Sequence, residues 1–381
     1  MAVPKLRFPE FTDDWEQRKL SDLVDVCSGM DYKHLSIGNI PVFGTGGYML
    51  SVDKALSYDR DAIGIGRKGT IDKPYILKAP FWTVDTLFYC IPRDEGTLNF
   101  DYDLFQCIDW KQKDESTGVP SLSKVAINDT DVMVPKTDEQ KKIGYFFEEL
   151  DLVITLHQRK LDDIKLLKKS MLQKMFPAEG RDVPEVRFPG FTAAWEQRKL
   201  GDLYTERNER GNGSLQILSV SIHTGVSDGE LDVDNLGKFV RRSEDKSTYK
   251  HVHSGDLIFN MMRAWQGAIG VAKTEGMISP AYISAIPSED IYPPFMNYLL
   301  RRKDVINQIN NLSYGVTDFR KRLYWNSFVQ VNCKLPSVEE QRNITDVFEK
   351  IDHLITLHQR KCDDLQKLIK ALLQQMFCLM V

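Results

Sequence analysis

The sequence lacks the features that mark secreted, metal-clustered or membrane-spanning proteins. Its six cysteines form no C-x-x-C pair, which argues against a zinc cluster or a disulfide framework and favours the reducing cytoplasm. The N-terminal residues contain no apolar stretch of the kind found in signal peptides. No run of about 18 apolar residues occurs, so no segment is expected to span a membrane. We therefore expect a soluble, cytoplasmic protein.

Motifs for nucleotide chemistry are missing or incomplete. There is no G-x-x-x-x-G-K-[ST] loop, which excludes an ordinary ATP-driven motor. The glycines from Gly64 to Gly69 match a dinucleotide-binding pattern, but Pro74 follows too closely for the helix that such a site needs. The Pro-Pro-Phe sequence ending at Phe295 resembles an amino-methyltransferase core, but Tyr292 stands where an Asn or Asp must hold the target amine. We therefore expect no catalytic residue, metal or cofactor of this chain's own.

The composition predicts several globular domains. Hydrophobic residues make up 42% of the chain and charged residues 27%, so sizeable cores can form. At 381 residues, two or three domains are expected. The net charge of −4 counts mildly against nucleic-acid binding, because proteins with that role are often basic.

Two segments of the chain occur twice with little change. Residues 3–23 (segment A) return as residues 183–203 (A′), and 15 of the 21 positions are identical. Residues 135–176 (segment B) return as residues 336–377 (B′), and 22 of the 42 positions are identical. The chain is therefore built from two consecutive copies of one unit.

The segments between these repeats differ from one another. Segment X covers residues 24–134 and segment Y covers residues 204–335, so the order is A–X–B–A′–Y–B′. A duplication that drifted uniformly would blur every segment alike. Close repeats around divergent middles instead indicate that A and B perform the same task twice, whereas X and Y perform two different tasks.

Segments B and B′ are predicted to be long helices that pair with one another. Thr137-x-x-Gln140 and Ser337-x-x-Glu340 read as capping boxes, and each follows a proline. A 4-3-4-3 spacing of mostly apolar residues then favours an antiparallel coiled coil, in which the central His157 meets His358. The expected seam consists of Ile143, Phe147, Leu150, Ile154, His157, Leu161, Ile344, Phe348, Ile351, Ile355, His358 and Cys362.

Segments X and Y are predicted to share one mixed α/β fold with different loops. The expected strands in X are residues 62–65, 75–77, 86–91 and 131–134; those in Y are residues 215–222, 256–259, 281–286 and 328–331, with helix over 293–309. Residues 118–124 (GVPSLSK) and 315–321 (GVTDFRK) match, and each leads through a last strand into a long helix. Loops that differ on a common scaffold are typical of recognition.

These motifs together resemble a known family. FPxFxxxWEQRKLxDL, the proline and EQ pair at the start of each long helix, LHQRK and the A–X–B–A′–Y–B′ order are similar to the specificity subunits of type I restriction–modification enzymes. The resemblance covers the whole chain. It implies an α/β (α+β) fold with two target-recognition domains separated by two long antiparallel helices and related by a pseudo-twofold repeat. The implied domains are residues 1–134 and 183–335, and the implied spacer helices are residues 135–182 and 336–381.

The resemblance also implies the function and the partners. The chain would bind double-stranded DNA as a non-catalytic subunit that reads a bipartite site. It would direct two methyltransferase subunits, which hold S-adenosylmethionine, and restriction subunits, which use ATP and magnesium. Helices of about 58 Å, at 1.5 Å per residue, would set the unread gap between the half-sites. Two other hypotheses remain open: a stand-alone DNA adenine methyltransferase, and a coiled-coil adaptor that does not touch DNA.

Side-chain chemistry supplies the candidate DNA contacts. Arg and Gln can read base edges in pairs of hydrogen bonds, whereas Lys, Ser and Thr mostly hold phosphates. For any single one of these residues, an ordinary solvent-exposed role is the stronger expectation. The candidates in X are Arg67, Lys68, Thr70, Ser121, Ser123 and Lys124. Those in Y are Arg241, Arg242, Arg263, Trp265, Gln266, Thr317, Arg320, Lys321 and Arg322. The charge balance of X counts against DNA binding, because X has 11 basic and 16 acidic residues, whereas Y has 16 basic and 14 acidic residues.

Overall fold

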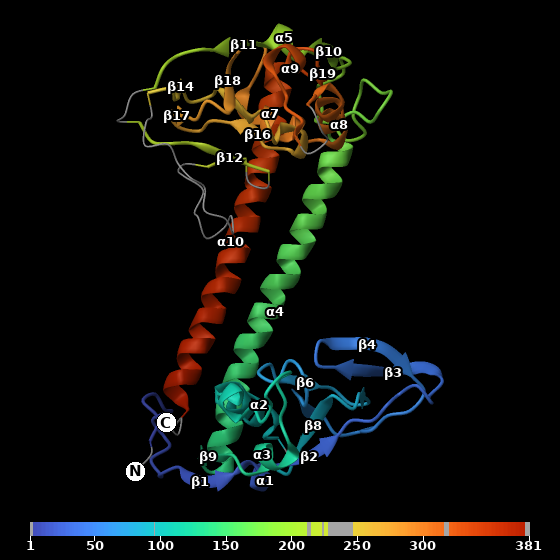
Figure 1. The fold of residues 1–381 in the computed structure, drawn as a ribbon, viewed down its shortest axis with the longest axis vertical. Coiled ribbons are helices and arrows are strands. Elements are labelled where there is room, and N and C mark those ends of the chain that lie inside the picture. The colour runs from blue at the N-terminus through green and yellow to red at the C-terminus, as the bar shows by residue number, and fades with distance from the viewer. Residues whose placement is uncertain are drawn as a thin grey trace. The chain divides into compact units, whose positions relative to one another are not determined.

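The computed structural model describes residues 3–94, 96–211, 215–222, 225–227, 247–315 and 320–377 (Figure 1). They form two compact units. The first comprises Met1–Lys160 and Leu357–Val381, and the second comprises Leu161–Thr356. Both boundaries fall inside the long helices α4 (Thr137–Lys174) and α10 (Val338–Met376), so each unit contains one end of each helix.

The first unit is built around a four-stranded antiparallel sheet in the order β2–β8–β5–β6. A three-stranded sheet in the order β4–β3–β7 adjoins it, and β1 pairs with β9. The strands are β1 Glu16–Lys19, β2 Val24–Ser28, β3 Ile37–Gly44, β4 Gly47–Val52, β5 Ala62–Gly66, β6 Tyr75–Leu77, β7 Trp82–Thr83, β8 Leu87–Pro92 and β9 Asp131–Val134; the short helices are α1 Leu20–Leu23, α2 Leu98–Cys107, η1 Trp110–Lys113 and α3 Lys124–Asn128.

The second unit has a four-stranded antiparallel sheet in the order β11–β18–β15–β16. Three two-stranded pairs accompany it: β10 with β19, β12 with β13, and β14 with β17. The strands are β10 Glu196–Lys199, β11 Tyr204–Arg207, β12 Ser219–Ser221, β13 Gly225–Ser227, β14 Lys250–Val252, β15 Leu257–Asn260, β16 Ile269–Val271, β17 Gly276–Ile278, β18 Tyr282–Pro287 and β19 Asn332–Leu335; the short helices are α5 Leu200–Leu203, η2 Ala264–Gln266, α7 Pro293–Leu299, α8 Lys303–Leu312 and α9 Trp325–Phe328.

The two four-stranded sheets have the same topology. In each sheet the strand after segment A or A′ lies at one edge, and it pairs with the last of the four strands in chain order. Even the register agrees, because Val24 lies opposite Pro92 and Tyr204 lies opposite Pro287. X and Y are therefore one fold. The β3–β4 hairpin of X, drawn in blue in Figure 1, is an addition to this shared sheet.

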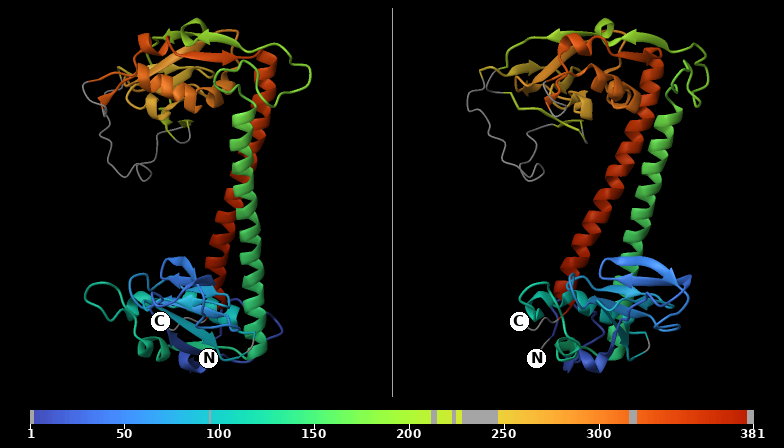
Figure 2. Two further views of the ribbon diagram at one scale, coloured as in Figure 1. Left: turned by 90° about the vertical axis from the view of Figure 1, so that its right-hand side faces the viewer. Right: turned by 45° about the vertical axis from the view of Figure 1, so that its right-hand side comes forward.

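The long helices pair antiparallel, and each unit shows this separately. In the first unit Phe147, near the start of α4, packs against Phe377 at the end of α10, with ring centroids 6.2 Å apart. In the second unit Phe176, just after α4, packs 6.2 Å from Phe348, near the start of α10. Figure 2 shows the C-terminal part of α10 beside the first globular domain.

The expected seam positions differ in how deeply they are buried. Ile143, Phe147, Leu161, Ile344, Phe348, Ile351 and Cys362 are buried, whereas Leu150, Ile154, His157, Ile355 and His358 are partly exposed. The midpoint histidines meet, because His157 Nδ1 lies 2.9 Å from His358 Nδ1. The histidine pair at the middle is therefore polar and partly exposed, whereas buried positions occur one turn further along each helix, at Leu161 and Cys362, and toward the helix ends.

The repeated A and B motifs are explained by one contact that occurs twice. Arg7 of segment A forms two hydrogen bonds, each of 2.7 Å, to the carboxylate of Glu139 in α4. Arg187 of A′ binds Glu340 of α10 in the same way, at 2.7 and 2.8 Å. Both glutamates are almost fully buried, so the loss of either arginine would leave an uncompensated buried charge.

The starts of the long helices correct the predicted capping boxes. In the second helix Ser337 Oγ accepts from the backbone N–H of Glu340 at 3.4 Å, but the Glu340 carboxylate is engaged by Arg187 and does not close the box. In the first, Thr137 is already helical, and the Gln140 side chain donates to the carbonyl of Pro135 at 2.8 Å. The glutamine of each EQ pair thus binds the carbonyl of the preceding proline.

The predicted strand over 328–331 is wrong. Residues 325–328 form α9, and the strand β19 begins four residues later than expected, at Asn332. Phe328 and Val331 are apolar because both are fully buried in the core, and these apolar residues made the sequence of the helix and the following turn resemble that of a strand. The predicted helix over 293–309 is two helices, α7 and α8. No helix in the described part of the chain is long and apolar enough to cross a membrane.

Candidate nucleic-acid interface

The candidate loop of X is held by backbone hydrogen bonds from two neighbouring segments. Gly66 ends β5, and the backbone N–H of Arg67 then donates to the carbonyl of Thr86 at 2.8 Å. A bridge joins Lys68 to Ser121, and the backbone N–H of Leu122 donates to the carbonyl of Arg67 at 3.0 Å. The structure therefore brings together two candidate segments that are about 50 residues apart in the sequence.

The side chains of this cluster differ in how available they are. Arg67 and Lys68 are exposed, although the Arg67 guanidinium lies 5.8 Å from the centroid of the Phe88 ring. Thr70 and Ser121 are partly exposed, and Lys124 is exposed at the first turn of α3. Ser123 has a structural role, because its hydroxyl accepts from the backbone N–H of Ala126 and caps α3. Ser123 is thus a weaker candidate than its neighbours.

The candidate loop of Y occupies the equivalent place on the second sheet. It follows β15, contains the short helix η2, and presents exposed Arg263 and Gln266, with Trp265 partly exposed. Trp265 Nε1 donates to the carbonyl of Met262 at 3.0 Å, which holds the indole against the loop. The backbone N–H of Leu323 donates to the carbonyl of Met261 at 2.8 Å. Arg322 and Arg320 are exposed beside this connection, and Lys321 is partly exposed. Arg241, Arg242 and Thr317 lie outside the described residues.

The corresponding hydrogen bonds correct the sequence match between the two domains. Leu122 bonds to the loop after β5 and precedes α3; Leu323 bonds to the loop after β15 and precedes α9. The structural equivalent of Leu122 is therefore Leu323, an offset of 201, as in the long helices. The match of GVPSLSK with GVTDFRK was displaced by four residues, because loop residues carry little periodicity.

The two motifs that resembled catalytic signatures are parts of the scaffold. The glycines after Ile63 end strand β5 and form a turn in which Gly69 has a φ of +90°. The Pro-Pro-Phe sequence opens α7, and Phe295 is fully buried against Phe176, with ring centroids 5.4 Å apart. Its proline pair begins a helix, for which proline is well suited at the first position.

A basic groove in the second unit was missed by the sequence reasoning. It has a volume of about 1060 Å³ and is lined by seven basic and three acidic side chains. The basic residues are Lys165, Lys168, Lys169, Lys273, Arg301, Arg302 and Lys303. They come from the second half of α4, from the loop before β17 and from the α7–α8 connection, so no local sequence window gathers them.

Parts of this groove are already engaged within the protein. Lys168 binds Asp352 of α10, and Arg302 donates to the carbonyls of Leu172 and Pro177 at 3.0 and 3.1 Å. Burial lowers the pKa of the Arg301 guanidinium, which donates to the carbonyls of Ser221 and Ile222, each at 3.3 Å. The groove therefore presents a positive surface built on a rigid, internally bonded frame.

Comparisons with known proteins connect this fold to one family. Residues 12–166 match the family described as Type I restriction modification DNA specificity domain. The type I restriction enzyme MjaVIII specificity subunit of Methanocaldococcus jannaschii is 23% identical over 338 residues, which cover 82% of this chain and 74% of that protein. The MjaIX specificity subunit of the same organism is 23% identical over 194 residues, covering 48% of this chain and 44% of that protein.

A solved structure shares the whole fold. The crystal structure of the type I restriction–modification system S subunit from M. genitalium superposes with a TM-score of 0.68 at 14% identity and covers 100% of both chains. At this identity the likeness concerns the fold, and that fold includes the two sheets and both long helices.

Proposed function

We propose that this chain, which belongs to the family of type I restriction–modification specificity subunits, reads a DNA site in two halves, one with each globular domain. Its own task is recognition, and it works with partner subunits on DNA. The observation that carries the bipartite reading is the repeated sheet: the same strand order and the same loop-anchoring hydrogen bond recur, but the exposed side chains differ.

The two loops offer different recognition chemistry. The first presents Arg67 and Lys68, and the second presents Arg263 and Gln266. An arginine can make two hydrogen bonds to guanine, and a glutamine can make two to adenine, in the major groove. Different loops at equivalent places therefore favour two different half-sites.

The basic groove of the second unit supports binding to the DNA backbone. Its seven basic side chains exceed its three acidic ones, so it carries excess positive charge that is not apparent from the composition of Y alone. Phosphate contacts fix position without reading sequence and weaken as salt rises. We assign the groove this positioning role, alongside the base-reading loops.

The long helices offer a repeated surface for partner subunits. Three pairs of apolar residues are exposed on α4 and α10 at the same offset of 201: Val153 and Leu354, Leu156 and Leu357, and Leu167 and Leu368. Exposed apolar residues on a helix favour a protein partner. Because the pattern occurs once on each helix, it supports two copies of one partner, which we assign to the methyltransferase subunits.

The test is methylation mapping of host DNA with the gene present and with it deleted. We expect a two-part methylated motif that disappears on deletion. A matched measurement is a DNA mobility shift with the chain and its methyltransferase partner, at increasing salt. Sequence-specific binding that requires both proteins is expected. Methylation of an undivided motif, or S-adenosylmethionine binding by the purified chain alone, would contradict the proposal and favour a stand-alone methyltransferase.

A further inference from the structure

Two histidines at the end of β14 face the same side of the second unit. His251 lies within β14 and His253 directly follows it, so both project from one face of an extended segment. Val252, between them, is fully buried on the opposite side. The two imidazole rings are close together, with centroids 4.3 Å apart.

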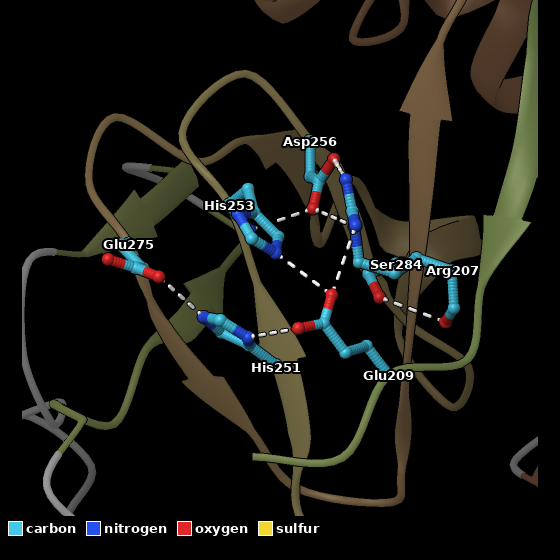
Figure 3. Close-up of polar contacts among 7 residues, drawn as sticks. All are labelled: Arg207, Glu209, His251, His253, Asp256, Glu275 and Ser284. Atoms are coloured by element: carbon cyan, nitrogen blue, oxygen red, sulfur yellow. Dashed lines mark hydrogen bonds and ion pairs between the residues drawn. The ribbon is translucent and has the colours of Figure 1, made fainter. Parts of the chain in front are cut away.

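Glu209, which follows β11, binds both imidazoles (Figure 3). Its Oε1 lies 2.7 Å from His251 Nδ1, and its Oε2 lies 2.9 Å from His253 Nε2. One nitrogen or oxygen from each of the three residues can be chosen so that all lie within 4.8 Å of one another. Three potential ligand atoms from two separate segments therefore converge on one point.

A second set of residues orients these three side chains. His251 Nε2 lies 2.7 Å from the carboxylate of Glu275, which fixes the ring and leaves Nδ1 directed toward Glu209. Asp256 accepts from the backbone N–H of His253 at 2.8 Å and from Arg207 at 2.6 and 3.0 Å. Metal-binding histidines commonly bond through their other ring nitrogen to a carboxylate, as His251 does to Glu275.

The charges around the cluster are those that a divalent cation would balance. Arg207 and Asp256 form a two-bond ion pair and neutralise one another, although Arg207 also reaches Glu209 at 3.2 Å. Glu209 and Glu275 then bring two negative charges to the pair of histidines. With both imidazoles neutral, one divalent cation restores neutrality; otherwise two protons must do so.

We propose that Glu209, His251 and His253 bind a divalent transition-metal ion of the Zn²⁺ class, oriented by Glu275. Two imidazoles and one carboxylate suit Zn²⁺, Co²⁺ or Ni²⁺ and are a poor set for Mg²⁺ or Ca²⁺, which prefer oxygen. A small outward movement of the side chains suffices, because ligand atoms 2.7–2.9 Å apart must separate to accommodate bonds of about 2.0–2.1 Å.

The ion would add side-chain bonds between two segments of the second domain that backbone hydrogen bonds already join. The N–H of His251 donates to the carbonyl of Glu209, and the N–H of Gly211 donates to the carbonyl of Tyr249, each at 2.9 Å. Glu209 follows β11 of the four-stranded sheet, whereas His251 belongs to the separate β14–β17 pair. Glu275 precedes β17, so the orienting residue comes from the partner strand of β14. The ion would stabilise the recognition domain of Y.

Titration of the chelator-treated, full-length chain with Co²⁺ tests the proposal, because Co²⁺ absorbs visible light when protein ligands bind it. We expect one equivalent to bind without a thiolate charge-transfer band, since free cysteines such as Cys333 and Cys362 are not ligands. Zn²⁺ should displace the Co²⁺ and raise the melting temperature. If the folded chain binds neither ion, or binds through thiolate, the proposal is wrong.

Variants separate a built site from adventitious binding. H251Q and H253Q should each lower Zn²⁺ affinity by more than 100-fold, whereas H34Q, in the first unit, should leave it unchanged. E275Q, which alters only the orienting carboxylate, should lower it about 10- to 100-fold. Circular dichroism of each variant without metal checks its fold, and E209Q supplies a second ligand variant if a histidine variant is unfolded. Equal affinity in wild type and the double variant H251Q/H253Q would overturn the assignment.

Discussion

Phe377, at the end of α10, stacks on Phe100 of α2, with ring centroids 5.3 Å apart and ring planes 27° from parallel. The core of the first unit therefore includes residues that follow the entire second unit in the sequence. The equivalent contact in the second unit is between Phe176 and Phe295, at 5.4 Å and 18°. Segment B′ completes the domain of X, and segment B completes the domain of Y.

This exchange predicts that F377A destabilises the first unit and F176A the second. Each phenylalanine is almost fully buried, so each truncation should cost about 3–5 kcal/mol of unfolding free energy. Hydrogen exchange should accelerate in β2, β5 and β8 for F377A, and in β11, β15 and β18 for F176A. L368A, at an exposed position of α10, is the control and should change little. Equal loss of protection in both sheets for either variant would contradict the exchange.

The facing histidines predict that acid weakens the helix pair. Burial lowers the pKa of His358, and His157, Lys361 and Lys160 lower it further. In the unfolded chain this histidine has its ordinary pKa of about 6.5, so it binds a proton at a pH at which the folded chain keeps it neutral. The stability from this group is present above about pH 6.5 and lost as the pH falls below that value. We expect H358Q to lose less stability than wild type between pH 7.5 and pH 5.5 in thermal unfolding; an identical loss would refute this.

A buried carboxyl group predicts the opposite pH dependence for the first domain. Burial raises the pKa of Asp101 to about 7, although a hydrogen bond from Thr97 opposes the shift. Only well below the ordinary pKa of about 3.8 is the group protonated in both states. As the pH rises from there toward 7, the unfolded chain ionises while the folded chain keeps its proton, so stability is lost. The advantage of D101N over wild type in unfolding free energy should therefore grow between pH 5 and pH 8 by on the order of 2–4 kcal/mol. Urea unfolding at both pH values tests this, and a uniform offset would exclude it.

Modular reading predicts that loop variants affect one half-site only. R263A or R320A should relax the bases read by the second domain, with a cost of about 1–3 kcal/mol for a lost bidentate contact. R67A is the matched variant in the first domain and should relax the other half. Methylation mapping with each variant compares the two halves of the motif. Equal changes in both halves would rule out independent reading.

Continuous helices predict that their length sets the unread gap in the DNA site. An insertion in α4 alone, such as four residues between Lys165 and Leu166, would break its register with α10, because Lys168 pairs with Asp352 nearby. Matched insertions of four residues after Lys160 and after Thr356 fall at the boundaries of the two units and keep the contacts within each. Each adds about 6 Å, or little more than one helical turn.

We expect this double insertion to lengthen the gap by about one or two base pairs, since DNA rises about 3.4 Å per base pair. The bases at each end should stay the same. The single insertion in α4 is the control and should lose stability or activity. An unchanged gap in an active double-insertion variant would end the ruler hypothesis.

The repeat made much of the architecture predictable. Duplicated helices with apolar residues at heptad spacing indicate an antiparallel pair, and the family match follows from the same residues. Local apolar patterns gave a wrong strand prediction where buried residues belong to a short helix and a turn, as at Phe328 and Val331. The sequence alignment of the loops in X and Y was wrong because variable loops have no periodic pattern. Leu323 was identified as the equivalent of Leu122 only from the matching backbone hydrogen bond that each makes.

The clusters that the sequence did not reveal depend on tertiary structure. The basic groove joins α4 to the α7–α8 connection, and Glu209 meets His251 across 42 positions. Only the H-x-H spacing of His251 and His253 was visible beforehand, and such a pair becomes informative only when a third ligand is placed beside it.

The division of each long helix between two units also affects the order of folding during synthesis. The second unit is one continuous stretch, Leu161–Thr356, so all of its contacts exist once that stretch has left the ribosome. The first unit begins earlier but must wait for residues 357–377. The domain made first would then be the last to close, and until then its Trp15 and Phe100 would lack their aromatic partner Phe377 and be open to chaperones.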